Sequence, residues 1–179
     1  MPNKMINNIY RIATGSSKKQ MLYAPFAGLF FIAVSSGFVL LPIYLDRILH
    51  IKPFIHAPWD LILSVPFLTV GTFYVVWSII IFFGVRGTPV PLSPPPVLVA
   101  KGPYKYSRNP MTAGLFLQMF GAGLLFGSAL SVLVFTPLYI FLHYLELKRV
   151  EEPELELRLG NAYVEYKNKV PMFFPWKKI

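Results

Sequence analysis

The chain contains no cysteine, which excludes disulfide bonds, thiolate nucleophiles and cysteine-ligated metals. Histidine is scarce as well, since only His50, His56 and His143 are present. A protein metal site needs several ligands that converge on one point, and these three positions do not provide them, so we predict no metal. The sequence also lacks a nucleophile-elbow serine, a phosphate-binding loop and a dinucleotide-binding glycine fingerprint in a suitable context.

Charged side chains are few and unevenly distributed. They make up 14% of the chain, whereas hydrophobic residues make up 55%; a typical soluble domain has about 25% charged residues. No Asp, Glu, Lys or Arg occurs in residues 24–45, 61–83 or 112–142. Because a helix needs about 20 apolar residues to cross a bilayer, the sequence predicts an integral membrane protein.

The predicted fold is all-α, with about four transmembrane helices. We place them at residues 24–45, 61–83, 112–127 and 129–147. The last two form a helical hairpin that turns at Gly127 and Ser128. A stripe of apolar residues after the hairpin predicts a C-terminal amphipathic cytoplasmic helix of about four turns. The stripe consists of Leu155, Leu159, Ala162, Tyr163, Tyr166 and Val170.

The positive charges indicate the orientation in the membrane. Of 17 Lys and Arg residues, only Arg47 and Lys52 lie in the loop between the first two spans. The positive-inside rule therefore predicts a multi-pass protein with both termini cytoplasmic. This topology accounts for the net charge of +9 without nucleic acid, which we do not expect as a partner. The N-terminal residues before the first span favour either an interfacial helix or a basic tail.

The length of 179 residues favours one membrane-embedded domain, 1–179. Within it, we expect residues 1–97 to supply the N-terminal spans and a proline-rich connector. We expect residues 98–175 to form the cofactor-binding catalytic core. The connector contains five prolines in residues 86–96, which favour an extended path. That path is either a stiff linker or a wall of a site.

Polar residues flank the predicted hairpin on its cytoplasmic side. Arg108 and Asn109 precede it, and Glu151 and Glu152 follow it. Because both stretches border the same hairpin, we expect them to lie near each other. From the residues alone, they form either a solvated charge network or a binding site. Likewise Gly114 and Gln118, on one face of the third span, favour helix packing or a groove for a flat ligand.

Two stretches of the sequence resemble a known superfamily. The stretch GPYKYSRNPM at residues 102–111, followed by Gly114, is similar to its signature G-x-Y-x-x-x-R-[HN]-P-M-Y-x-G. A later block begins at Glu151 and ends at Pro171, and it resembles E-E-x-x-L…F-G-x-x-Y-x-x-Y-x-x-x-V-P. Both belong to the isoprenylcysteine carboxyl methyltransferase and phospholipid methyltransferase superfamily. Asn109 stands where prenylcysteine enzymes usually have histidine, so the resemblance defines the methyl donor better than the acceptor.

The resemblance implies transfer of a methyl group from S-adenosylmethionine to a lipophilic acceptor in the membrane. We expect isoprenylcysteine carboxyl methylation, with phospholipid N-methylation of the phosphatidylethanolamine type as the alternative. A membrane reductase or a non-catalytic membrane protein is the alternative of another class. The implied catalytic residues are Arg108 and Glu152, and Gly114 and Gln118 bind substrate. The implied cofactor-binding residues are Gly102, Tyr104, Asn109, Pro110, Met111, Glu151 and Glu152.

Overall fold

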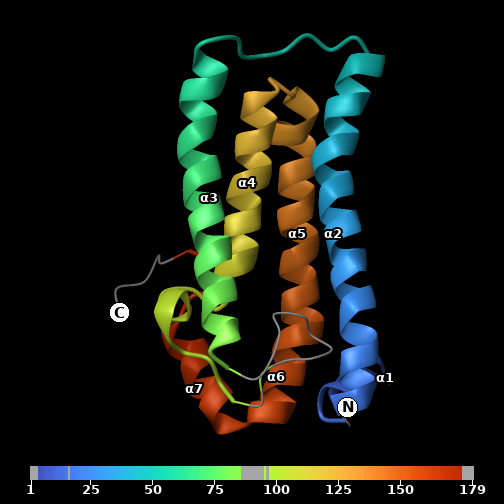
Figure 1. The fold of residues 1–179 in the computed structure, drawn as a ribbon, viewed down its shortest axis with the longest axis vertical. Coiled ribbons are helices and arrows are strands. Elements are labelled where there is room, and N and C mark those ends of the chain that lie inside the picture. Colours follow the sequence, from blue (N-terminus) through green and yellow to red (C-terminus); the bar gives the residue numbers. More distant parts are fainter. Residues whose placement is uncertain (1–3, 16, 86–94, 96, 175–179) are drawn as a thin grey trace. The chain divides into compact units, whose positions relative to one another are not determined.

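The computed structural model describes residues 4–15, 17–85, 95 and 97–174 (Figure 1). All regular secondary structure within these residues is helical, which confirms the all-α prediction. The α-helices are α1 (Lys4–Ala13), α2 (Ser17–Ile48), α3 (Trp59–Phe83), α4 (Pro110–Leu125), α5 (Thr136–Glu146), α6 (Glu152–Leu159) and α7 (Asn161–Lys169). A 3-10 turn, η1, covers Gly102–Lys105, and two π-helical segments, η2 and η3, cover Ser131–Phe135 and Leu147–Glu151.

The chain divides into two compact units, each built from segments distant in sequence. Unit 1 comprises the described residues of Met1–Phe31, Trp77–Pro110 and Tyr144–Ile179. Unit 2 comprises Ile32–Val76 and Met111–His143. The functional division into 1–97 and 98–175 stays a prediction, because compactness alone does not locate a cofactor.

Two helices are long and apolar enough to cross a bilayer. They are Pro25–Ile48 and Trp59–Phe82, each of 24 residues, with mean hydropathies of 2.2 and 2.0. Large apolar side chains on them are exposed, including Phe30 at 72% and Phe73 at 58%. In water such exposure is unfavourable, whereas in lipid it has no such cost. These helices lie where the first two spans were predicted; the four-span topology stays a prediction.

The turn between α4 and the next helix lies where the sequence predicted it. Gly127 has φ +60°, a left-handed conformation that glycine adopts readily. Its carbonyl accepts a hydrogen bond from the N–H of Phe54, at 3.2 Å. The Ser128 hydroxyl accepts one from the N–H of Ser131, at 3.1 Å, and donates to the buried carboxylate of Asp46. The turn is therefore tied to the last turn of α2 and to the middle of the α2–α3 loop, within unit 2.

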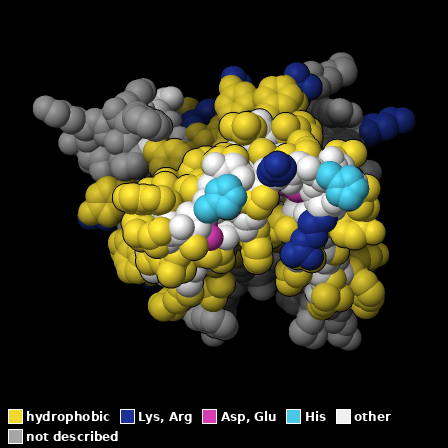
Figure 2. Space-filling view, turned by 90° about the horizontal axis from the view of Figure 1, so that it is seen from above, with side chains coloured by type: hydrophobic (Ala, Val, Ile, Leu, Met, Phe, Trp, Pro, Cys, Tyr) yellow, Lys and Arg dark blue, Asp and Glu magenta, His cyan; other side chains and the backbone are white. Residues whose placement is uncertain are grey.

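The loop between α2 and α3 is short and carries few charges. Figure 2 shows the face that includes it, with a small group of basic and histidine side chains surrounded by hydrophobic ones. The exposed residues of the group are Arg47, His50, Lys52 and His56. This group contains two of the 17 Lys and Arg residues of the chain.

Small residues bring α3 and α4 close together in unit 2. A Cβ at Gly71 would lie 2.6 Å from the carbonyl oxygen of Gly114, so only glycine permits this approach. Gln118 donates a hydrogen bond from Nε2 to the Thr72 hydroxyl, at 3.0 Å. Helix packing therefore accounts for Gly114 and Gln118, and their predicted contact with substrate stays a prediction.

The prediction of a single four-turn helix in the C-terminal segment is wrong. Helical conformation continues from residue 129 through α6, and then ends at Gly160. Gly160 has φ 60° and ψ −143°, which no helix accommodates, and α7 starts at the next residue. The predicted apolar stripe is buried on α7, at Tyr163 and Tyr166, whereas Leu155 and Leu159 on α6 are only half-buried.

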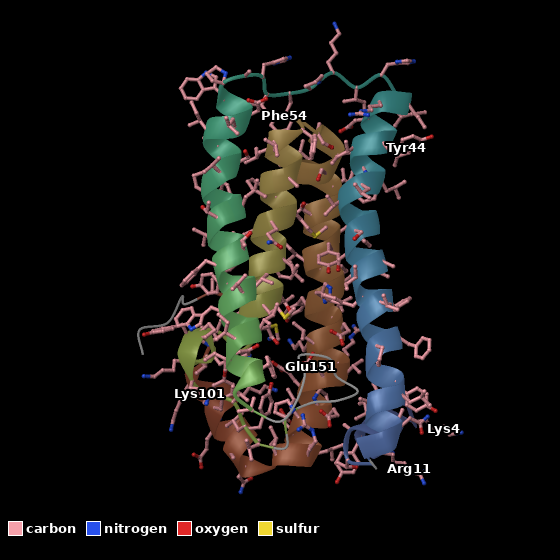
Figure 3. The ribbon with its side chains drawn as sticks, in the orientation of Figure 1. Lys4, Arg11, Tyr44, Phe54, Lys101 and Glu151 are labelled. Carbon is pink, nitrogen blue, oxygen red and sulfur yellow. The ribbon has the colours of Figure 1, made fainter. Side chains whose placement is uncertain are left out.

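The N-terminal residues form an ordered helix rather than a tail. α1 packs against α6 and η3 within unit 1. Its buried side chains are Ile6 and Ala13, while Lys4 and Arg11 are exposed (Figure 3).

The proline-rich connector at residues 86–96 lies outside the described residues except for Pro95. The choice between a stiff linker and a wall of a site therefore stays open.

Candidate functional site

A short clasp joins the two sequence blocks in unit 1. We use the term for residues 107–109 together with residues 171–172. The backbone N–H of Arg108 donates to the carbonyl of Pro171 at 2.9 Å, and that of Asn109 donates to Met172 at 3.1 Å. The Ser107 hydroxyl and the Asn109 side-chain amide also donate to the Met172 carbonyl, at 3.2 and 3.3 Å. The clasp fixes the backbone that carries Arg108.

Two buried tyrosines hold the same turn from either side. The Tyr166 hydroxyl donates to the carbonyl of Tyr104 at 2.6 Å. The Tyr104 ring meets Phe82 edge-on, with centroids 5.6 Å apart. Its hydroxyl forms a hydrogen bond with Ser78. Burial raises the pKa of Tyr104 and of Tyr166, so both phenols stay neutral and available for hydrogen bonds.

Gly102 shapes the start of this turn. Its φ is +59°, and a Cβ there would lie 2.9 Å from the side chain of Ile81. A residue with a side chain would be both strained and crowded, which gives a physical reason for glycine in the first block. The backbone therefore bends sharply beside α3 before it reaches Tyr104.

A buried ion-pair network lies next to the clasp. Arg108 donates from Nη1 to Oε1 of Glu152, and the two side chains are 10% and 5% exposed. The other oxygen of Glu152, Oε2, lies 3.0 Å from Nζ of Lys167, which also contacts Oε1 of Glu156 at 2.8 Å. The predicted proximity of Arg108 and Glu152 is confirmed.

One donor in this network is left without a partner. Nε of Arg108 is buried and makes no hydrogen bond to any residue that the structure describes. A buried unpaired donor is costly, and a charged one more so. Such a group suits an anionic ligand, because a guanidinium binds carboxylates through directed N–H bonds. We regard this atom as the clearest mark of a binding site in unit 1.

Glu151 lies beside the network, at the end of η3 (Figure 3). Burial raises its pKa to about 8, and the nearby carboxylates of Glu146 and Glu154 add to the effect. Glu154 is itself paired with Arg158, at 2.8 Å. A π-helical turn often occurs at functional sites. Here the π-helical segment ends at Glu151, directly before α6 begins at Glu152.

The structure brings together part of the predicted site. Gly102, Tyr104, Arg108, Asn109, Pro110, Glu151 and Glu152 belong to unit 1, whereas Met111, Gly114 and Gln118 belong to unit 2. The sequence reasoning missed the roles of Lys167 and Ser107. Lys167 directly follows Tyr166 of the second block, but the sequence does not show which residues its long side chain contacts. Among the described residues, no group of three His, Asp or Glu side chains could hold a metal ion.

The fold and the site define a class: an all-helical protein with two helices apolar enough to cross a membrane and a buried charge network on its polar segments. Residues 59–162 match the model of the phospholipid methyltransferase family. The match covers more than half of the chain, and the chain belongs to this family of membrane methyltransferases. It places the protein in the superfamily that the two sequence blocks indicated.

Two curated relatives are similar over just under half of the chain. The protein-S-isoprenylcysteine O-methyltransferase of Schizosaccharomyces pombe is 33% identical over 79 residues, which is 44% of this chain and 33% of the relative. The protein of the same name in Saccharomyces cerevisiae is 36% identical over 80 residues, 45% of this chain and 33% of the relative. The chain thus matches about a third of the length of these relatives. No solved structure matches.

Proposed function

We propose that the protein transfers a methyl group from S-adenosylmethionine to the carboxylate of a lipophilic, prenylcysteine-like acceptor. The observation that carries this proposal is the buried guanidinium of Arg108, which binds Glu152 through Nη1 and keeps Nε unpaired. The names of the two curated relatives support the choice of acceptor. Family membership supports methyl transfer as the reaction class.

The residues of unit 1 fit the proposed donor. S-adenosylmethionine carries a carboxylate, an ammonium group and an adenosine, and it supplies an electrophilic methyl group on a sulfonium. Glu151 is a suitable partner for the ammonium, because the positive charge of a bound ligand would favour the ionised carboxylate over the neutral form that burial stabilises. The Asn109 side chain has an amide oxygen for polar groups. The clasp holds the Asn109 side chain, because its amide donates to the Met172 carbonyl at 3.3 Å. Such fixed polar groups lower the entropic cost of binding.

A carboxylate acceptor makes simple demands on the protein. Its oxygen is already a nucleophile at neutral pH, so no proton has to be removed. Arg108 would orient the carboxylate through Nε, and Glu152 and the clasp would hold Arg108 in place. The protein then contributes alignment of donor and acceptor and exclusion of water. A membrane-embedded site suits both, because the prenyl group stays in lipid.

One observation favours phospholipid N-methylation as a second candidate. An ammonium headgroup must lose a proton before it can accept a methyl group. Glu151, with its pKa raised to about 8 by burial and by neighbouring carboxylates, is matched to that proton transfer. The two candidates are separated by the acceptor that the purified protein methylates: a prenylcysteine analogue or phosphatidylethanolamine.

Cofactor binding tests the proposal directly. The purified protein should bind S-adenosylhomocysteine in detergent, as measured by calorimetry, and should not bind a nicotinamide dinucleotide. Asn109→Leu should weaken binding about ten- to hundredfold, because bonds to a charged ligand are worth about 1.5–3 kcal/mol. Asn168→Leu, at an exposed position on α7, is the control. Binding of a nicotinamide instead would favour a reductase, and binding of neither would favour a non-catalytic protein.

We also propose four membrane crossings with both termini in the cytoplasm. Cysteines can be introduced singly because the chain has none. Asn8→Cys and Asn168→Cys, both at exposed positions, should react with an impermeant thiol reagent only after the cells are opened. Lys52→Cys, in the loop between α2 and α3, should react in intact cells. Labelling of Asn168→Cys in sealed cells would rule out this topology.

A further inference from the structure

Lys167 occupies a position that the proposed reaction does not yet explain. It lies on α7, and its ammonium group contacts Glu152 at 3.0 Å and Glu156 at 2.8 Å. The Lys167 side chain is 34% exposed and Glu156 is 40% exposed, whereas Glu152 is 5% exposed. The lysine therefore links a solvent-accessible carboxylate to the buried one that binds Arg108.

The two oxygens of Glu152 have separate partners. Oε1 accepts from Arg108 and Oε2 faces Lys167. The hydrogen bonds to Glu156 and Glu152 raise the pKa of Lys167, so it stays charged at neutral pH. Two cations, Arg108 and Lys167, thus contact the one buried carboxylate. Glu156 pairs with Lys167 at 2.8 Å but makes no contact with Arg108, and at 40% exposure its effect on the buried guanidinium is screened by water.

The remaining positive charge is available to a ligand at one atom, Nε of Arg108. If Lys167 were absent, Glu152 would neutralise Arg108 alone, and the guanidinium would attract a further anion only weakly. With Lys167 present, Glu152 is shared, and the buried unpaired Nε of Arg108 keeps its attraction for an anion. Opposite charges in a partly dry site interact more strongly than in water.

We infer that Lys167 is a positioning residue that reserves Arg108 for a ligand carboxylate, by holding the second oxygen of Glu152. The inference rests on the proposed function. The carboxylate belongs either to the amino-acid end of the methyl donor or to the prenylcysteine acceptor. Both have the same chemistry, and the two arms of the experiment separate them.

The first arm measures binding by calorimetry. S-adenosylhomocysteine and its decarboxylated analogue are titrated into wild type, Lys167→Met, Lys167→Arg and Lys169→Met, the last being an exposed lysine on the same helix. If the donor's carboxylate is the ligand, wild type binds the carboxylated compound more tightly than the decarboxylated one. In Lys167→Met the ratio of these two affinities should be about tenfold smaller. Lys167→Arg and Lys169→Met retain the wild-type ratio.

The second arm measures methyl transfer to a prenylcysteine analogue with a free carboxylate. If the acceptor's carboxylate is the ligand, Lys167→Met raises the acceptor KM about tenfold with a smaller change in kcat. Lys167→Arg restores the wild-type KM.

Two results would overturn the inference while wild type remains active. In the first, Lys167→Met changes neither the carboxylate preference nor the acceptor KM by more than twofold. In the second, it weakens both cofactor analogues equally and lowers thermal stability, which would give Lys167 a purely structural role. Failure of wild type to bind S-adenosylhomocysteine would instead reject the proposed function, and the inference with it.

Discussion

Arg108→Lys should reduce single-turnover methyl transfer to a prenylcysteine analogue about 100-fold or more. Lysine keeps the charge but lacks the planar fork, so it cannot bind Glu152 and a second carboxylate in fixed directions. Loss of one preorganised donor to reacting oxygen atoms commonly has an effect of about this size. Affinity for S-adenosylhomocysteine should change much less if Arg108 binds the carboxylate of the acceptor, as in the proposed function, whereas a loss of tenfold or more would assign that carboxylate to the donor. Rapid-quench kinetics and calorimetry on the same preparation measure both.

Arg149→Lys is the matched control, since Arg149 is exposed on η3 close to the same site. It should turn over at the wild-type rate. Arg108→Ala is less informative, because removing one partner of a buried ion pair destabilises a protein by about 3–5 kcal/mol. If Arg108→Lys methylates the prenylcysteine analogue as fast as wild type, Arg108 does not contact the acceptor. If the variant fails only with phosphatidylethanolamine, the amine acceptor is favoured.

Glu151→Gln should make the protein more stable at alkaline pH, and the gain should disappear at acidic pH. The pKa of Glu151 is raised by burial from its ordinary value of 4.5 to about 8. Between these two values the folded state keeps a proton that the unfolded state has released, so stability falls as the pH rises. The slope is about 1.4 kcal/mol for each pH unit, which amounts to a few kcal/mol at pH 9. Glutamine has no proton to lose and no such slope.

Unfolding midpoints in detergent between pH 5 and pH 9 measure this effect. Glu165→Gln, at an exposed position on α7, should follow the wild-type curve throughout. Parallel curves for wild type and Glu151→Gln would show that the Glu151 carboxyl is not held in its neutral form. A carboxyl whose pKa is raised this far by burial and by neighbouring carboxylates is typical of a functional site. The same variant should also slow methylation of an amine acceptor, which needs a proton acceptor.

The sequence determined the features that depend on local composition. Charge-free stretches located α2 and α3, because a bilayer core excludes ionised side chains from any helix that crosses it. The turn at Gly127 followed from a glycine that interrupts an apolar run. The proximity of Arg108 and Glu152 was also predictable, since the two residues flank one hairpin. Each of these features is set within a few residues of chain or by one connection.

Only the tertiary structure decided how the site is assembled. The clasp between residues 107–109 and 171–172 uses backbone groups, which carry no signature in the sequence. The break at Gly160 was missed because apolar spacing continued across it. Lys167 joins Glu152 across 15 residues of chain, through a side chain whose direction depends on how α6 and α7 pack. Contacts of this kind arise from the arrangement of whole helices, and local periodicity contains no information about them.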